Sequence, residues 1–320
     1  MNPLTVLVAN AYQPHHLAKL RASFSDVNFV QLPKDGAVPV GGESAEVLLF
    51  LALTKPDLQR TLAGAPGVRW IHLSTAGFDW ALVPEVEERK IMLTRSAEAK
   101  RDAVAEFTIA FIFQTSKRLP MLQNAQAEHR WARPDPDFVR GKTVGIIGAG
   151  AIGCEVARLA HALGMRVIGT KRNPEALPYF DQVLAPDALT QVFGAADFVV
   201  LACPLTHETR NLIGAEQLRQ MKPSAYLINI ARGGIIVEAD LIHALQEGWI
   251  AGACLDAFEQ EPLPPDSALW NAPNTIITPH CAYASPRNID SVVDEFIVNL
   301  NHYRRNEPLR HLPKNLQLGY

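Results

Sequence analysis

The sequence has little of what would place it in several large classes of protein. Only four of its 320 residues are cysteine, and they lie far apart. That spacing fits neither a disulfide scaffold nor a Cys-x-x-Cys metal site. No apolar run approaches the ~20 residues that cross a membrane, and the first ten residues lack the basic and apolar regions of a signal peptide. We therefore expect a reduced, cytoplasmic protein with no metal and no membrane partner.

An excess of charge of one sign is also missing. The chain has 30 basic and 33 acidic residues and a net charge of −3, so we expect no broad electrostatic contact with nucleic acid. Hydrophobic residues make up 48% and charged residues 20%, which is typical of a globular chain that buries a sizeable core. At about 150 residues per domain, the length suggests roughly two domains.

Short β-branched runs alternate with longer segments of helical periodicity. In the first hundred residues the strand candidates are Leu4–Ala9, Asn28–Leu32, Val47–Leu51, Trp70–Ser74 and Ile91–Thr94. A second series comprises Thr143–Ile147, Arg166–Gly169, Phe198–Ala202, Tyr226–Ile230, Gly252–Leu255 and Thr275–Ile277. Alternation of this kind is typical of βαβ units with parallel sheets. We expect an α/β protein, and six strands are the number in a doubly wound dinucleotide-binding fold.

Several helices are expected between and after these strands. Cys154–Leu163 and Glu238–Gln246 have helical periodicity, and Ala103–Leu122 reads as one long helix that is apolar on most faces. Such a helix is usually buried between domains or in a subunit interface. The segment Ser285–Tyr303 is amphipathic and is expected to return to the first domain.

A glycine-rich turn follows the strand Thr143–Ile147. Gly148, Gly150 and Gly153 form the pattern GxGxxG between a strand and a helix. The first glycine permits a tight turn, the second lets the backbone approach a pyrophosphate, and the third lets the helix pack on the strand. Free N–H groups at the start of the helix, at Ala151 and Ile152, would face the phosphates. The turn therefore predicts a dinucleotide cofactor.

The end of the next strand indicates which dinucleotide is preferred. Enzymes that prefer NAD place Asp or Glu there to accept hydrogen bonds from the ribose. This chain has Thr170, Lys171 and Arg172 instead. A carboxylate would repel a 2′-phosphate, whereas two cations can bind it, with about 1.5–3 kcal/mol for a charged hydrogen bond. We expect NADP(H) to be preferred and NAD(H) to be accepted.

The second half of the chain carries a specific, ordered set of motifs. They are LACPLTHETRNLI, MKPSAYLINIARGG, AGACLDAFEQEP and TPHCAYAS, within a match that runs from about Gly141 to Ser285. This set resembles the D-isomer-specific 2-hydroxyacid dehydrogenase family, in its NADP-preferring, glyoxylate/hydroxypyruvate reductase-like branch. The match is weaker in the first hundred residues, where LSTAGFDW is similar to the loop that binds the substrate carboxylate in that family.

The resemblance implies three catalytic residues. Arg232 matches the arginine that binds substrate, Glu261 the acid that pairs with histidine, and His280 the proton donor and acceptor. The chemistry needs these residue types, because a 2-oxo acid that accepts hydride becomes an alkoxide that must be protonated. Histidine can transfer that proton near neutral pH, and an arginine fork can hold the carboxylate and the C2 oxygen.

The resemblance also implies the domain organisation. The substrate domain would be discontinuous, formed by residues 1–100 and 286–320, with the dinucleotide-binding domain inserted as residues 101–285. Both would be doubly wound, Rossmann-like or flavodoxin-like, with the active site in the cleft between them. The apolar helix Ala103–Leu122 would belong to a homodimer interface.

Further ligand contacts are implied at matching positions. Substrate contacts are expected at Ala76, Gly77, Arg232 and Tyr283. Cofactor contacts beyond the glycine-rich turn are expected at Cys203, Pro204, Thr209, Ile230, Ala231, Asp256 and His280. Arg95 or Ser96 could also face the substrate, because this chain departs from the usual family pattern there.

Two other functions remain open at this point. One is a short phosphoglycerate dehydrogenase-like enzyme, and the other is a non-catalytic, dinucleotide-sensing protein that resembles the corepressors of this fold. Fold alone does not decide function. Glu261 argues against the formate dehydrogenases of the family, which carry an amide at that position.

Overall fold

The chain forms two compact units. The computed structural model describes residues 3–75, 77, 81–96 and 98–312. The small unit comprises residues 1–100 and 285–320, and the large unit comprises residues 101–284. The second boundary differs by one residue from the domain ranges expected from the sequence.

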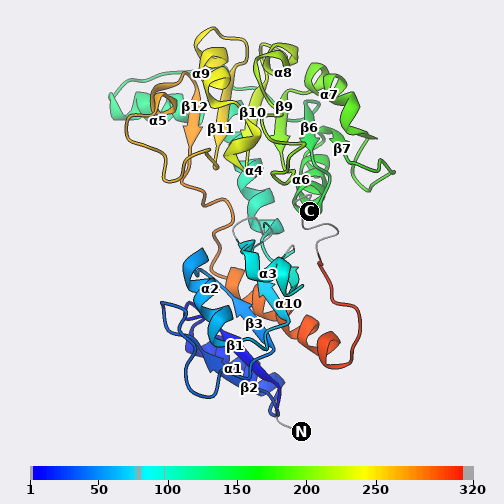
Figure 1. Ribbon diagram of the computed structural model, residues 1–320. Helices are drawn as coiled ribbons and strands as arrows, with labels where there is room; N and C mark the ends of the chain where they lie inside the picture. The colour runs from blue at the N-terminus through cyan, green and yellow to red at the C-terminus, as the bar shows by residue number, and fades with distance from the viewer. Residues whose placement is uncertain (1–2, 76, 78–80, 97, 313–320) are drawn as a thin grey trace. The chain divides into compact units, whose positions relative to one another are not determined.

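A five-stranded parallel sheet forms the centre of the small unit (Figure 1). Its strands are β1 (Thr5–Val8), β2 (Asn28–Gln31), β3 (Val47–Phe50), β4 (Trp70–Leu73) and β5 (Met92–Arg95). Their order is β2-β1-β3-β4-β5, the flavodoxin-like order of a doubly wound sheet. The helices are α1 (Pro14–Ser23), α2 (Lys55–Gly64), α3 (Pro84–Glu88) and α10 (Asn288–Arg304), and α1 packs against α10. The unit thus joins both ends of the chain in one core.

The large unit contains a seven-stranded parallel sheet. Its strands are β6 (Thr143–Ile147), β7 (Arg166–Thr170), β8 (Gln182–Leu184), β9 (Phe198–Leu201), β10 (Tyr226–Asn229), β11 (Gly252–Leu255) and β12 (Thr275–Ile277). Their order is β12-β11-β10-β9-β6-β7-β8, which is a Rossmann order with one added strand. The expectation of six strands was wrong because the short β8 is only half-buried and lacks a continuous apolar run.

Helices cover both faces of this sheet. The α-helices are α4 (Arg101–Ser116), α5 (Leu119–Ala127), α6 (Ala151–Ala162), α7 (Leu189–Ala195), α8 (Ala215–Gln220) and α9 (Glu238–Gln246). Short 3-10 segments are η2 (Pro186–Ala188), η3 (Gly233–Ile235) and η4 (Ala268–Asn271). One apolar core lies between the sheet and α7, α8 and α9, and a second lies between the sheet and α4 and α6. Strands buried on both faces explain the continuous apolar runs in the sequence.

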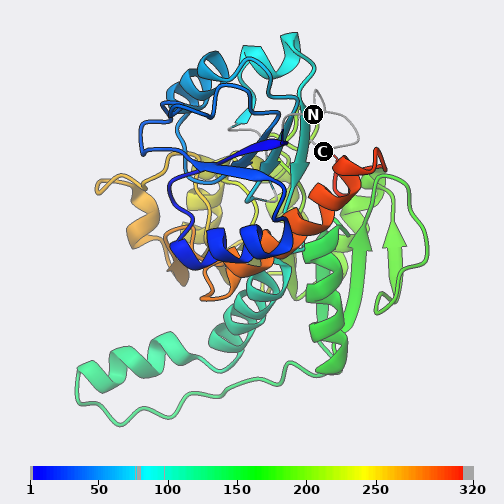
Figure 2. The ribbon, with the colours of Figure 1, turned by 90° about the horizontal axis from the view of Figure 1, so that it is seen from below.

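The single helix expected over Ala103–Leu122 is wrong, because α4 ends at Ser116 and α5 begins at Leu119. Pro120 explains the break. It has no N–H for a helical hydrogen bond, and its ring would clash with the carbonyl of Ser116. Arg118 between the helices has a φ of 55°, and α5 then extends away from the sheet of the large unit (Figure 2).

Among the described helices, none combines the length and apolarity required to cross a membrane.

Candidate active site

The carboxyl ends of the large unit's strands carry the predicted site residues. Because all pairings in this sheet are parallel, these ends meet at one edge. The glycine-rich turn follows β6, Lys171 and Arg172 follow β7, and the loop from Ala202 follows β9. Arg232 follows β10, and His280 follows β12. Ligands of open α/β sheets bind at this edge.

The glycine-rich turn has the geometry that a dinucleotide requires. Gly148 has a φ of 108°, and a Cβ there would lie 2.7 Å from the backbone nitrogen of Cys203. A Cβ on Gly153 would lie 2.2 Å from the Gly148 oxygen, so α6 can pack this closely only with glycine. At Gly150 a Cβ would meet no described atom within 4 Å, which leaves open space beside the first turn of α6. That turn offers unpaired N–H groups to an anion.

Both cations after β7 are engaged by acids of the same unit. Lys171 forms an ion pair with Glu175, four residues further along the chain, and Arg172 forms one with Glu208 in the loop after β9. All four side chains are at least one-third exposed. Sequence reasoning identified the cations but missed Glu208, because the partner lies 36 residues away.

The loop after β9 is held by its own hydrogen bonds. The Thr209 hydroxyl donates to the Pro204 oxygen at 2.6 Å, and the Thr206 N–H donates to the Thr209 hydroxyl at 2.8 Å. Cys203 is buried, and burial raises the pKa of its thiol to about 12, so the thiol is neutral at physiological pH. The structure therefore gives Thr209 a clear role in shaping the turn, and cofactor contacts by this loop stay predictions.

Asn229, at the end of β10, positions the turn that carries Arg232. Its buried amide donates to the Arg232 oxygen at 3.0 Å and to the Ala257 oxygen at 3.4 Å. Its side-chain oxygen accepts from the Ala231 N–H at 3.0 Å. Next to it, a Cβ on Gly233 would lie 1.8 Å from the Phe258 carbonyl carbon, so the turn passes in direct contact with the following loop. Packing therefore requires glycine at position 233.

His280 and Glu261 form a hydrogen-bonded pair. The His280 Nδ1 lies 2.8 Å from Glu261 Oε2. A carboxylate can only accept, so Nδ1 carries the hydrogen. The other carboxylate oxygen, Oε1, accepts from the Phe258 N–H at 3.0 Å. The acid is thus fixed by its own loop, and it orients an imidazole whose side chain is 32% exposed.

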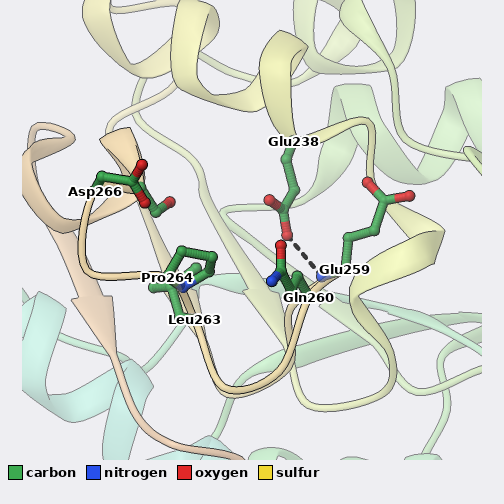
Figure 3. A pocket seen from close by; sticks show the side chains of 7 residues that line it. Glu238, Glu259, Gln260, Leu263, Pro264 and Asp266 are labelled. Carbon is green, nitrogen blue, oxygen red and sulfur yellow. Dashed lines mark hydrogen bonds between the residues drawn. The ribbon is translucent and has the colours of Figure 1, made fainter.

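Glu238, at the start of α9, anchors the loop that carries Glu261. Its Oε1 accepts from the Glu259 N–H at 2.7 Å, and Figure 3 shows this bond at the edge of a surface pocket. Glu238, Glu259 and Asp266 give the pocket an acidic lining. Sequence reasoning missed Glu238, because nothing in its local pattern distinguishes it from a helix N-terminal acid.

Asp256 fixes the turn that carries His280 by binding residues on both sides of it in the sequence. Its carboxylate is buried and accepts from the Thr278 hydroxyl at 2.6 Å and from the N–H groups of Cys281 and Ala282, each at 2.9 Å. These bonds hold the backbone of His280, which has a φ of 50°. The ring of Tyr283 lies edge-on to the imidazole, with 6.2 Å between centroids. The proposed contact of Asp256 with a cofactor stays a prediction.

The predicted carboxylate loop belongs to the small unit. Ala76 lies outside the described residues. Gly77 accepts a hydrogen bond at its oxygen from the Thr75 hydroxyl at 2.6 Å. The role of both residues in substrate binding stays a prediction, as does the role of Arg95, which ends β5.

A histidine cluster in the small unit has spacing that resembles a metal site. His15, His16 and Asp290 present ligand atoms within 4.8 Å of one another. However, His16 Nδ1 accepts the Gln13 N–H at 3.0 Å, so its Nε2 carries a hydrogen, 3.3 Å from Asp290. The arrangement is a hydrogen bond between α1 and α10, because a protonated nitrogen cannot coordinate a metal.

Known proteins are similar to this chain over most of its length. Residues 109–282 match the family model for the NAD-binding domain of D-isomer-specific 2-hydroxyacid dehydrogenases. The chain is 34% identical to a glyoxylate reductase of Korarchaeum cryptofilum over 284 residues, which cover 84% of this chain and 81% of the relative.

Solved structures are similar to the whole chain. One is a D-isomer-specific 2-hydroxyacid dehydrogenase from Xanthobacter autotrophicus in complex with NADPH and MES, with a TM-score of 0.88, 28% identity and 100% coverage of both chains. Another is an NADPH-dependent glyoxylate/hydroxypyruvate reductase from Sinorhizobium meliloti in complex with NADP and sulfate. For that structure the TM-score is 0.85, the identity is 25%, and coverage is 99% of this chain and 100% of the other. The prediction of two Rossmann-like, parallel-sheet α/β domains is confirmed.

Proposed function

The chain belongs to the D-isomer-specific 2-hydroxyacid dehydrogenase family and is an NAD(P)-dependent oxidoreductase; we propose that it reversibly reduces glyoxylate, hydroxypyruvate or a similarly small 2-oxo acid to the D-2-hydroxy acid. The similarity to glyoxylate reductases supports this substrate class. The large unit would bind the dinucleotide, and the small unit would contribute substrate contacts at Ala76 and Gly77.

The His280–Glu261 pair is the observation that carries the proposal. A bound reduced nicotinamide supplies the hydride. His280, with Nδ1 donating to Glu261 at 2.8 Å, presents Nε2 as the proton donor to the C2 oxygen. Glu261 stabilises the imidazolium and fixes the tautomer, and the Phe258 N–H fixes Glu261 in turn. In the oxidative direction the same nitrogen accepts the proton.

Arg232 is the proposed substrate anchor. A guanidinium offers a planar set of donors that can reach both a carboxylate and the neighbouring C2 oxygen. It would also stabilise the negative charge that develops on that oxygen. The buried amide of Asn229 donates to the Arg232 backbone oxygen. This bond supports the role, because it fixes the backbone from which the arginine side chain extends. Tyr283, edge-on to the imidazole, is proposed to line the acyl side of the site.

The glycine-rich turn and the first turn of α6 would hold the cofactor's pyrophosphate. Gly148, Gly150 and Gly153, with the N–H groups of Ala151 and Ile152, fit that group because no described atom lies within 4 Å of a Cβ built at Gly150. Further cofactor contacts are proposed at the end of β7 and in the loops after β9, β10 and β11, namely at Thr170, Cys203, Pro204, Thr209, Ile230, Ala231 and Asp256.

We propose NADP(H) as the preferred cofactor, with NAD(H) accepted. Support comes from Lys171 and Arg172 at the end of β7, where NAD-preferring proteins place an acid. Two solved relatives carry NADPH or NADP.

We also propose a cytoplasmic homodimer. The helix pair α4 and α5 leads into a segment that exposes 87% of Trp131 and 77% of Phe138. Exposed aromatic side chains of this size are typical of interaction surfaces. Sedimentation at micromolar concentration tests the assembly, and a monomer under those conditions contradicts it.

A substrate panel tests the reaction. Glyoxylate, hydroxypyruvate, phenylpyruvate and phosphohydroxypyruvate would be assayed with NADPH and with NADH, following loss of reduced-nicotinamide absorbance, and the product's configuration would be determined by chiral chromatography. We expect turnover of the small acids to the D-product and a higher kcat/KM with NADPH. Phosphohydroxypyruvate as the best substrate would favour the phosphoglycerate dehydrogenase-like alternative. Tight cofactor binding without any turnover would favour the dinucleotide sensor.

A further inference from the structure

An ion pair connects the two loops that flank the glycine-rich turn. In the sheet, β6 lies between β7 and β9. Arg172 follows β7, Glu208 lies in the loop after β9, and their side chains form a salt bridge. The neighbouring backbone confirms how close the three segments are, because the Ala149 N–H donates to the Thr170 oxygen and the Ala202 N–H donates to the Ile147 oxygen, each at 2.9 Å.

The position of Glu208 matters because no acid ends β7. A carboxylate at that place in a Rossmann fold accepts hydrogen bonds from the adenosine ribose of NAD. In this chain the corresponding residues are Thr170, Lys171 and Arg172, and the next acid, Glu175, is paired with Lys171. Glu208 brings a carboxylate to the same cation cluster from the other side of the turn.

We propose that Glu208 is a specificity-determining residue that reduces the preference for NADP(H) over NAD(H), because it competes with the 2′-phosphate for Arg172. With NAD(H), Glu208 stays paired with Arg172 and accepts from the ribose 2′-hydroxyl. With NADP(H), the phosphate takes the place of Glu208 as the partner of Arg172. The inference rests on the proposed function, which places the adenosine ribose at this end of β7.

The relative strengths of the two pairings allow this exchange. The Arg172 and Glu208 side chains are 40% and 58% exposed, and ion pairs between side chains as exposed as these contribute little because water screens them. A phosphate carries more charge than a carboxylate, and an arginine fork can bind two of its oxygens. The phosphate can therefore displace Glu208, but the displaced carboxylate remains nearby and repels it.

Binding measurements with Glu208→Gln test the proposal. Dissociation constants for NADPH, NADH, 2′,5′-ADP and ADP would be measured by calorimetry at low and high salt. We expect NADPH and 2′,5′-ADP to bind about three- to tenfold more tightly at low salt, with a smaller gain at high salt. NADH should bind a few-fold more weakly, because its ribose 2′-hydroxyl loses a charged acceptor. ADP has the same hydroxyl and no nicotinamide, so its binding should weaken by a similar factor.

Two further variants make the result specific. Glu175→Gln removes the acid paired with Lys171 and is the matched control, and it should leave the NADH dissociation constant unchanged. In an Arg172→Gln background, Glu208→Gln should lose most of its gain for 2′,5′-ADP. Equal changes for NADPH and NADH, or weaker NADPH binding in Glu208→Gln, would overturn the role of Glu208.

The experiment separates this inference from the proposed function. The Glu208 result is read from the change in the ratio of the two dissociation constants, without turnover. A wild-type protein that binds NADH more tightly than NADPH would contradict the proposed preference, whereas the response of the ratio to Glu208→Gln would still decide the role of Glu208.

Discussion

Two histidines, one in each unit, show how surroundings decide what the same side chain does. His72 lies within β4, fully buried between the hydroxyls of Thr94 and Ser96. His280 follows β12, about one-third exposed, and donates to the Glu261 carboxylate. The described hydrogen-bond partners of His72 are therefore neutral hydroxyls, whereas His280 has a charged partner and is partly exposed.

The hydrogen-bond directions explain this difference. The Trp70 indole N–H donates to the Thr94 hydroxyl at 2.8 Å, so that hydroxyl can donate to His72 Nδ1 at 2.7 Å. His72 is thus held neutral, and burial, followed by the nearby charge of His311, lowers its pKa to about 3. His280 directs its Nδ1 hydrogen to Glu261, which leaves Nε2 free of that bond. The small unit uses its histidine for packing, whereas the large unit's histidine is suited to proton transfer.

The largest effect is expected from removing His280, the proposed proton donor. His280→Gln should lower kcat by about 100- to 10,000-fold, which is the contribution typical of general acid–base catalysis. The dissociation constant for NADPH should change little, because the phosphates are proposed to bind at the glycine-rich turn. Steady-state kinetics and calorimetry on the same preparation check both statements. If kcat stayed at the wild-type value, both histidines would be structural and the contrast would fail.

A backbone change should act through the position of Arg232. Gly233→Ala places a Cβ 1.8 Å from the Phe258 carbonyl carbon, so the turn must move, and a displacement of about 1 Å can lower kcat/KM by about 100-fold. Gly234→Ala is the matched control, because its Cβ would approach only side-chain atoms of Arg210 and Leu205 at 3.3 Å. Similar kinetics for the two variants would show that this close approach does not position Arg232.

A smaller effect is expected when the histidine keeps its place and loses its charged partner. Glu261→Gln should lower kcat about tenfold, because the amide supplies no negative charge beside the imidazole during proton transfer. Steady-state kinetics of the reduction measure this loss. A kcat equal to that of the wild type would mean that the pair at 2.8 Å does not assist proton transfer.

The smallest effect concerns stability and the buried histidine. The pKa of His72 is lowered to about 3 in the folded chain, while an unfolded histidine titrates near 6.5. The unfolded chain then binds more protons, so stability rises with pH between about 3 and 6.5. This group should make the protein about 1.4 kcal/mol less stable at pH 5.5 than at neutral pH. Urea unfolding of wild type and His72→Gln at both values checks this, and an equal pH dependence in the two proteins would contradict it.

Local patterns predicted most of the fold. The strands Thr143–Ile147, Gly252–Leu255 and Thr275–Ile277 have the expected bounds. The first two are fully buried, and strands buried on both faces leave a continuous apolar run. The third is a half-buried edge strand. Pro120 was a sequence signal for the break between α4 and α5, but the apolar residues around it favoured the prediction of one continuous helix. The short strand β8 could not be predicted, because its half-buried residues take their conformation from pairing with β7.

The residues of the candidate site also fall into a group that the sequence predicted and a group that it did not. His280, Glu261 and Arg232 could be named because the residue types and their ordered motifs are specific, and the structure brings the first two into contact. The residues that hold them, Asn229 and Glu238, carry no such signal, since a buried amide or a helix N-terminal acid has many uses.

The sequence by itself determined the alternation of strands and helices, the glycine-rich turn and the chemical types of the site residues. Each of these depends on neighbours within a few positions or on a fixed motif. Only the tertiary structure decided that Glu208 pairs with Arg172, that Asn229 joins two loops, and that His72 is neutral while His280 faces a carboxylate. Those outcomes depend on burial and on contacts between residues 19 to 36 positions apart in the sequence. The contacts form because the parallel sheet brings the ends of distant strands to one edge.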